Sequence, residues 1–304
     1  MSEEEDDTNT CASCGKAGGD DIKLMKCIDC HYVRYCSDKC QRDHRPQHKN
    51  QCKKRVAELH DEILFNQPES SHFGDCPICC LPQPTDPKKS TVNTCCSKRI
   101  CKGCYYANQI REIQGRLQQK CPFCRKALPK TKEERKERLV KRAEANDPVA
   151  ISYMGMIRKQ EGDYEAAFDY WSQAAALGDV EAHYHLSCLY FESLYPNGVA
   201  VDEELIDEGY EKDEKKFLHH LTEAAIGGHF VARHDLGVRE EINGRFDRAV
   251  KHFIIAAKLG YDPSLKSAKS LYRSELMSKD DFTTALRGYQ AAIEAAKSPQ
   301  RERV

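Results

Sequence analysis

The 304-residue sequence has no run of about 18 apolar residues, the length that an α-helix needs to cross a bilayer. It also has no excess of either charge, because 47 lysines and arginines are matched by 48 aspartates and glutamates, for a formal net charge of -1. These absences exclude an ordinary transmembrane helix. They also leave no overall field that would favour nucleic acid or a membrane surface as a partner.

The first residues, MSEEEDD, lack the basic and apolar segments of a secretory signal and the arginines of a transit peptide. We therefore expect an intracellular protein, in the cytoplasm or the nucleus, without a membrane partner. Residues 1–10 carry five acidic groups and no apolar periodicity, which predicts a disordered acidic tail.

Cysteine is nearly absent from the second half of the chain. Of 17 cysteines, 16 lie in the first 124 residues, and only Cys188 lies beyond them. The clustered residues recur in C-x-x-C pairs. In a reducing compartment, such clusters indicate metal ligands rather than disulfides.

The first cluster occupies residues 11–52 and contains eight residues of types that bind zinc. Successive members are separated by 2, 12, 2, 5, 3, 7 and 3 residues. Each short gap lets two ligands bind one ion from a tight turn or one helical turn. A segment this small buries too little apolar surface to fold alone, so bound metal is expected to supply its stability. The eight residues are Cys11, Cys14, Cys27, Cys30, Cys36, Cys40, His48 and Cys52.

This spacing, together with the tract YCSDKCQRDHRPQHKNQC, resembles the MYND-type zinc finger. The resemblance implies two interleaved zinc sites, Cys11, Cys14, Cys36 and Cys40 in one and Cys27, Cys30, His48 and Cys52 in the other. It also implies a surface that binds other proteins, including short proline-containing peptides, and no chemistry of its own.

Seven basic residues lie between Lys39 and Arg55, against the single acid Asp43. Such a group could contact phosphates, but no aromatic residues alternate with the charges as they do on many nucleic-acid surfaces. A solvated helical face is therefore preferred, and nucleic acid is not an expected partner. Residues 53–74 are predicted to form a helix and then a linker rich in proline, serine and glycine.

The second cluster lies in residues 75–129, where four cysteine pairs are separated by gaps of 2, 15, 0, 4, 2, 16 and 2 residues. This pattern resembles the RING-type finger. The resemblance implies one zinc site of Cys76, Cys79, Cys101 and Cys104 and another of Cys95, Cys96, Cys121 and Cys124. The second pair departs from the family, because Lys98 stands where a histidine is common and Cys95 adjoins Cys96. Cys80 is a conceivable replacement for one of them, so the ligand set of this site stays open.

A RING-type ubiquitin ligase has no catalytic residue of its own and acts by holding a ubiquitin-conjugating enzyme. By resemblance, Ile78 and Pro122 match the positions that line its docking groove, and Arg125 matches the basic position that contacts ubiquitin. The alternative for these residues is packing within the turns and ordinary surface exposure. Ligase activity is therefore an alternative interpretation, with residues 76–124 recruiting the conjugating enzyme and the repeats of residues 147–298 recruiting substrate.

Residues 130–146 are predicted to be a charged connecting helix, and residues 147–298 contain an internal repeat. Gly155, Gly162 and Trp171 recur 82 residues later as Gly237, Gly244 and Phe253. A repeat of this size indicates stacked helical hairpins, and these features resemble Sel-one-like repeats, which are relatives of the tetratricopeptide repeat. Residues 195–212 are predicted to be a loop insertion, and residues 299–304 a tail.

The predicted fold class is therefore two small zinc-stabilised modules of irregular α+β structure followed by an all-α helical-hairpin solenoid. We expect four zinc ions, and other proteins as partners. The predicted function is an interaction scaffold or adaptor, with the RING-type ubiquitin ligase as the alternative. No glycine-rich cofactor loop follows a predicted strand, so methyltransferase activity is not expected.

Overall fold

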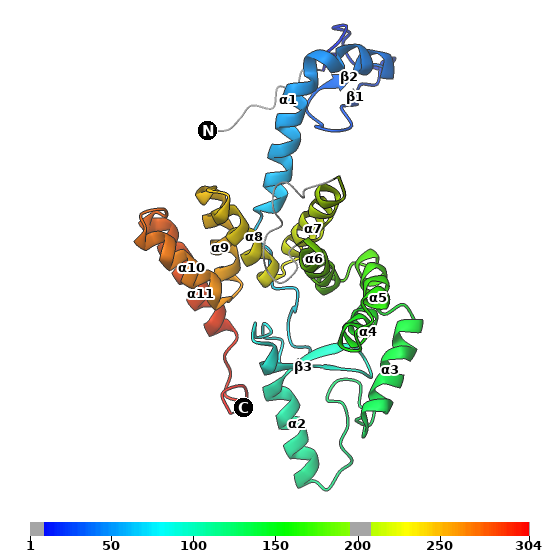
Figure 1. Cartoon of the computed structure of the whole chain (residues 1–304), viewed down its shortest axis with the longest axis vertical. Helices are drawn as coiled ribbons and strands as arrows, with labels where there is room; N and C mark the ends of the chain where they lie inside the picture. Colours follow the sequence, from blue (N-terminus) through cyan, green and yellow to red (C-terminus); the bar gives the residue numbers. More distant parts are fainter. Residues whose placement is uncertain (1–8, 195–207, 304) are drawn as a thin grey trace. The chain divides into compact units, whose positions relative to one another are not determined.

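The computed structural model describes residues 9–194 and 208–303 and divides the chain into two compact units, residues 1–66 and 67–304 (Figure 1). The predicted acidic tail, apart from its last two residues, and positions 195–207 of the predicted insertion lie outside the described residues. Each unit has its own core, and the two are described separately.

The first unit consists of a small hairpin and one long helix. Strand β1 (Met25–Lys26) pairs antiparallel with β2 (Arg34–Tyr35), and α1 (Asp38–Leu64) follows. Ser37 caps α1 by accepting a hydrogen bond from the backbone N–H of Cys40. The core of this unit is a cluster of cysteines around the buried Tyr35. Because so little apolar surface is buried there, the fold depends on what the cysteines bind.

Helix α1 is 27 residues long. It runs without a break, despite Pro46, through the end of the first cysteine cluster and into the helix predicted after it. Leu64 is buried, whereas Ile63 is 59% exposed and Val56 is 39% exposed. On the basic side of this helix, the Arg55 guanidinium pairs with Glu58 and Glu62 at 3.2 and 3.1 Å.

After residues 67–74, the second unit continues with the second module, which we define as residues 75–129. It contains a short 3-10 turn η1 (Pro87–Lys89), the antiparallel strands β3 (Ser90–Asn93) and β4 (Lys98–Cys101), and helix α2 (Lys102–Gln114). The strand register places Ser90 opposite Cys101 and Asn93 opposite Lys98. Buried cysteines and Ile100 form the core of the module.

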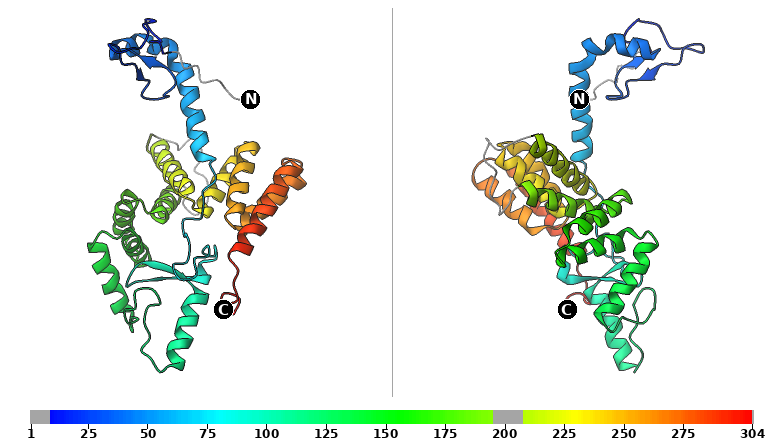
Figure 2. Two further views of the ribbon diagram at one scale, coloured as in Figure 1. Left: turned by 180° about the vertical axis from the view of Figure 1, so that it is seen from behind. Right: turned by 45° about the vertical axis from the view of Figure 1, so that its right-hand side comes forward.

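Nine helices follow in the part of this unit that the structure describes (Figures 1 and 2). Helix α3 leads into four helical hairpins, α4 with α5, α6 with α7, α8 with α9, and α10 with α11, and neighbouring hairpins pack in chain order. We call α4 to α11 the repeat array. The bounds are α3 (Lys132–Glu144), α4 (Pro148–Gln160), α5 (Tyr164–Ala176), α6 (Val180–Leu194), α7 (Glu208–Ile226), α8 (Phe230–Ile242), α9 (Phe246–Lys258), α10 (Asp262–Arg273) and α11 (Lys279–Ala295).

The internal repeat corresponds to one recurring contact. Gly155 of α4 faces the ring of Trp171 in α5, and Gly237 of α8 faces Phe253 in α9 in the same way. Both rings are buried, and the missing side chain on each glycine lets the paired helices approach closely. Helix α7 already begins at Glu208, so the last residues of the predicted insertion are helical. The predicted fold class is confirmed.

Candidate metal centres

Sixteen cysteine and histidine residues come together as four groups of four, and in each group the ligand atoms lie within 4.8 Å of one another. The groups are Cys11, Cys14, Cys36 and Cys40; Cys27, Cys30, His48 and Cys52; Cys76, Cys79, Cys101 and Cys104; and Cys95, Cys96, Cys121 and Cys124. Their composition and grouping agree with those implied by the two resemblances.

The distances within these groups suit zinc. Sulfur atoms 2.3 Å from a tetrahedral zinc ion lie about 3.8 Å apart. The Sγ atoms of Cys14 and Cys36 are 3.5 Å apart, and those of Cys79 and Cys101 are 3.9 Å apart. In the mixed group, Cys30 Sγ lies 3.2 Å from His48 Nε2. The donor sets therefore fit four tetrahedral sites, and zinc ligation by these residues stays a prediction.

Four of the cysteine pairs share one turn geometry. In each C-x-x-C turn, the residue after the second cysteine has a positive φ, and its N–H donates to the carbonyl of the first cysteine over 2.8 to 3.0 Å. The four residues in this position are Gly15, His31, Cys80 and Arg125. Such turns direct backbone N–H groups and both sulfur atoms toward one point, which prepares a site for a cation bound by thiolates.

A neighbouring thiol and the backbone of its turn together stabilise the thiolate of Cys76. For Cys76, the hydrogen bond from the Cys101 thiol has the largest effect on the pKa, burial opposes it, and the N–H groups of Cys101, Cys79 and Ile78 add to it. Together they lower the pKa of Cys76 to about 4. A cysteine that is already a thiolate near neutral pH binds zinc without first losing a proton.

The structure also shows which of Cys80, Cys95 and Cys96 belong to the fourth group. Cys80 is exposed, has a φ of 54° and lies outside all four groups. The adjacent Cys95 and Cys96 both join Cys121 and Cys124, with 3.3 Å between the sulfur atoms of Cys95 and Cys124 and 3.9 Å between those of Cys96 and Cys121.

A tight turn makes this neighbouring pair possible. The Asn93 carbonyl accepts the N–H groups of Cys96 and Ser97, and Ser97 has a φ of 53°. Because the chain reverses between β3 and β4, both thiols reach the same side of the turn.

The three residues assigned to ubiquitin transfer have different environments. Ile78 is 42% exposed, Pro122 is half-buried, and its neighbour Phe123 is 43% exposed. The Arg125 guanidinium is paired within the module, at 3.2 Å from the buried Glu112 carboxylate and 3.0 Å from the Asn108 side-chain oxygen. Arg125 is therefore held by its own module.

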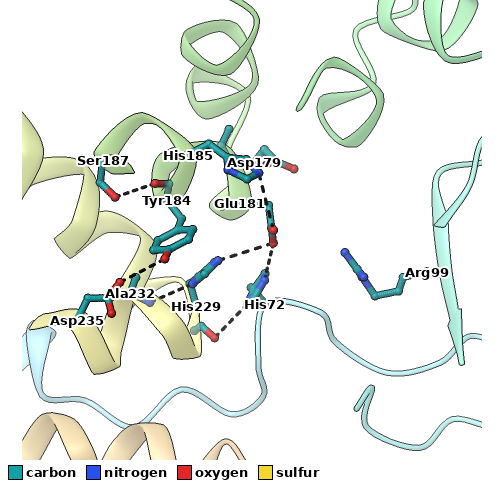
Figure 3. A network of polar contacts seen from close by, with 12 residues as sticks. His72, Arg99, Asp179, Glu181, Tyr184, His185, Ser187, His229, Ala232 and Asp235 are labelled. Atoms are coloured by element: carbon teal, nitrogen blue, oxygen red, sulfur yellow. Dashed lines mark hydrogen bonds and ion pairs between the residues drawn. The ribbon is translucent and has the colours of Figure 1, made fainter. Parts of the chain in front are cut away.

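A separate polar network joins the segment before the second module to the repeat array (Figure 3). The Nε2 atom of His72 lies 2.7 Å from the Glu181 carboxylate, and its Nδ1 atom lies 3.4 Å from the Gly228 carbonyl. Burial tends to raise the pKa of Glu181, but the hydrogen bond from His72 and the nearby histidines outweigh it and hold the value at about 2. Sequence reasoning assigned His72 to a linker, and no local pattern marked it.

His229 completes this network and stacks on His72, with ring centroids 4.1 Å apart. Its Nδ1 atom accepts the backbone N–H of Ala232 and so caps α8. In a neutral imidazole this leaves the hydrogen on Nε2, the atom that faces Glu181 at 3.7 Å. A metal ion would need the lone pair of that atom, so His72, Glu181 and His229 form a polar junction rather than a fifth metal centre.

The second module and the segment before it contact the array at the turns between successive hairpins. Besides His72 at Gly228, Thr85 Oγ1 donates to the Gly260 carbonyl over 3.0 Å. Near the start of the array, Arg142 Nε donates to Ser97 Oγ over 2.8 Å. Gly228 has a φ of 83°, and an added Cβ would lie 2.7 Å from the Ser70 carbonyl oxygen. The turns between the hairpins thus contact both the module and the segment before it.

The fold and these sites define a class of protein in which cysteine-rich modules suited to zinc are joined to an array of helical repeats. Residues 11–52 match the family model of the MYND finger, which implies zinc as the metal of this segment. No curated protein matches the chain.

One similar solved structure is a Sel1 repeat protein from Oxalobacter formigenes, with 24% identity and a TM-score of 0.42. The match covers 55% of this chain and 66% of that one, just under two thirds of its length. For the repeats of this chain, the direct evidence is its own recurring contacts of Gly155 with Trp171 and Gly237 with Phe253.

Within residues 9–194 and 208–303, no helix combines the length and apolar character that crossing a bilayer requires.

Proposed function

We propose that this protein is a zinc-dependent scaffold that binds other proteins, with a proline-containing peptide as the ligand of its MYND finger. The supporting observation is a group of exposed apolar side chains around the Cys27–Cys30 turn: Ile28 is 74% exposed, Tyr32 49% and Met25 45%. An aromatic ring beside aliphatic groups suits the flat, rigid surface of a proline-containing segment. Sequence reasoning missed these residues, although three apolar residues flanking a metal-binding turn were a visible signal.

We expect Tyr32→Ala to weaken binding of a proline-containing peptide about tenfold or more, because exposed aromatic anchors dominate small interfaces. Fluorescence anisotropy with a panel of labelled peptides and the full chain would measure this. Lys16→Ala is a matched control, since Lys16 is an exposed side chain of the same finger, distant in sequence from this turn. Zinc content should stay unchanged in both variants. Equal affinities for Tyr32→Ala and the parent protein would contradict this binding surface.

The ubiquitin-ligase alternative is favoured by one observation, the exposure of Ile78 and Phe123 on two turns of the second module. The pairing of Arg125 with Glu112 and Asn108 opposes it, because the guanidinium would have to leave a buried carboxylate to reach ubiquitin. The scaffold is therefore the preferred function.

An autoubiquitination assay with zinc-loaded protein and a panel of conjugating enzymes separates these functions. As a scaffold, the protein should give no ubiquitin chains with any of them. Chain formation that is lost in Ile78→Ala would support the ligase alternative. Chain formation that survives Ile78→Ala would show that this groove is not the docking site.

A further inference from the structure

The last described residues of the chain return to the second module. In the segment after α11, residues 298–302, Gln300 and Arg301 lie against the first cysteines of this module and the start of α2 (Figure 1). The contacts join residues more than 200 positions apart in the chain, from Arg301 to Cys79, Leu81 and Pro82. Sequence analysis identified no role for this segment.

Arg301 is the centre of the contact. One terminal nitrogen, Nη1, donates to the carbonyls of Pro82 and Ala296 over 2.6 and 2.8 Å. The other, Nη2, donates to the Leu81 carbonyl over 3.1 Å and to Cys79 Sγ over 3.3 Å. All four N–H groups of the two terminal nitrogens therefore have an acceptor, and one of the acceptors is a predicted zinc ligand.

A second contact lies on the other cysteine pair of the same site. The side-chain oxygen Oε1 of Gln300 accepts from the Cys104 thiol over 3.8 Å. The neighbouring Gly103 has no side chain, and a Cβ there would lie 2.8 Å from the carbonyl carbon and oxygen of Gln300 and 2.9 Å from the backbone nitrogen of Arg301. Only glycine at this position lets the returning segment approach so closely.

The charge of a zinc ion with four thiolates explains why a cation beside the site is favourable. Four thiolates and one Zn²⁺ carry a net charge of -2, and burying such a charge is unfavourable without compensation. The N–H group and positive charge of Arg301 next to Cys79 Sγ reduce that cost, as outer contacts generally do for metal ligands.

We propose that residues 298–302 form the outer shell of the Cys76, Cys79, Cys101 and Cys104 zinc site, with Arg301 as the positioning residue that retains the ion. The inference rests on the proposed zinc occupancy of the second module. It adds a structural link to the proposed scaffold. The segment that follows the repeat array becomes part of the zinc site, so the array and the module stabilise each other.

The test uses the full zinc-loaded chain. N-ethylmaleimide is added together with a competing zinc chelator, and mass spectrometry follows the alkylation of each cysteine. In Arg301→Ala, Cys76, Cys79, Cys101 and Cys104 should react about 10- to 100-fold faster, the range by which loss of an outer contact weakens metal binding. Cys95, Cys96, Cys121 and Cys124 are the internal reference and should change much less.

Two further variants keep the test specific. Gly103→Ala keeps the Arg301 side chain but pushes the segment that carries it away from the site, and it should accelerate the alkylation of the same four cysteines. Arg301→Lys should fail to restore protection, because an ammonium group cannot supply the forked pattern of four N–H groups. Arg303→Ala, an exposed arginine two residues away, should behave as the parent does.

A spectroscopic measurement distinguishes an effect on the sulfur atoms from a general loosening. With Co²⁺ in place of zinc, Arg301→Ala should shift the sulfur-to-metal charge-transfer absorption, because an N–H donor to Cys79 Sγ is lost. Unchanged alkylation rates and an unchanged spectrum would overturn the proposal while leaving the zinc sites intact. A parent chain that binds only two zinc ions, both in the MYND finger, would instead overturn the zinc occupancy of the second module.

Discussion

Cys96→Ser is expected to reduce the zinc content from four ions per chain to three and to unfold part of the second module. Cys96 is a member of the fourth cysteine group, and its sulfur atom lies 3.9 Å from that of Cys121. Structural zinc contributes an apparent free energy on the order of 10 kcal/mol, and the 55-residue module has little other than cysteines in its core. Losing one ligand removes most of that contribution.

Elemental analysis of the purified variant measures the ion count, and amide hydrogen exchange measures the loss of structure. Exchange should accelerate across β3, β4 and α2, while the MYND finger keeps its protection. Protein that still holds four zinc ions with Cys96→Ser would remove Cys96 from the ligand set.

Cys80→Gly is the matched control for this experiment. Cys80 is a neighbouring cysteine of the same module, but it lies outside the group and has a φ of 54°. Glycine adopts this conformation without the cost that other residues incur, so this variant should keep four ions and gain up to about 1 kcal/mol of stability. Loss of an ion in Cys80→Gly would show that the site exchanges Cys80 for one of its neighbours.

Gly155→Ala and Gly237→Ala should each lower the free energy of unfolding of the repeat array by about 1 to 3 kcal/mol, the usual range for overfilling a packed core. A Cβ on Gly155 would lie 2.6 Å from Trp171 Nε1, and one on Gly237 would lie 2.6 Å from Phe253 Cε1. Both rings are almost fully buried, at 1% and 0% exposure, so neither can move aside. The clash outweighs the roughly 0.5 to 1 kcal/mol that alanine gains over glycine inside a helix.

Gly155→Ala should be the more severe of the two, because the Trp171 indole also donates a hydrogen bond to the Ser152 carbonyl over 3.0 Å. Urea unfolding followed by circular dichroism measures the loss, and the double variant should be nearly additive because the two contacts lie in different hairpins.

Gly288→Ala supplies the control for a helical glycine without a rigid neighbour. Its Cβ would approach Cγ of Lys258, an exposed and flexible side chain, at 2.4 Å. The lysine can turn away, so this variant should be neutral or slightly stabilising. An equal loss of stability in Gly288→Ala and Gly237→Ala would contradict the view that the buried rings cause the effect.

Local spacing in the sequence was sufficient to predict the cysteine turns and the helical hairpins of this protein. A C-x-x-C pair forms its turn from four successive residues, so its geometry is set by nearest neighbours. Two resemblances implied the grouping of sixteen ligand-type residues, with the choice among Cys80, Cys95 and Cys96 left open. The 82-residue recurrence of glycine and aromatic residues likewise predicted helical hairpins, because the Gly237 and Phe253 pair repeats the contact of Gly155 and Trp171.

The tertiary structure alone decided how these elements meet. It separated Cys80 from Cys95 and Cys96, because the chain reversal at Ser97 cannot be recognised from cysteine spacing. It paired Arg125 with Glu112 and His72 with Glu181, and it placed Arg301 on Cys79. The Arg125 pair depends on how the second module folds, and the other two contacts join residues more than 100 positions apart and depend on how the hairpins stack; no local pattern of residues specifies either.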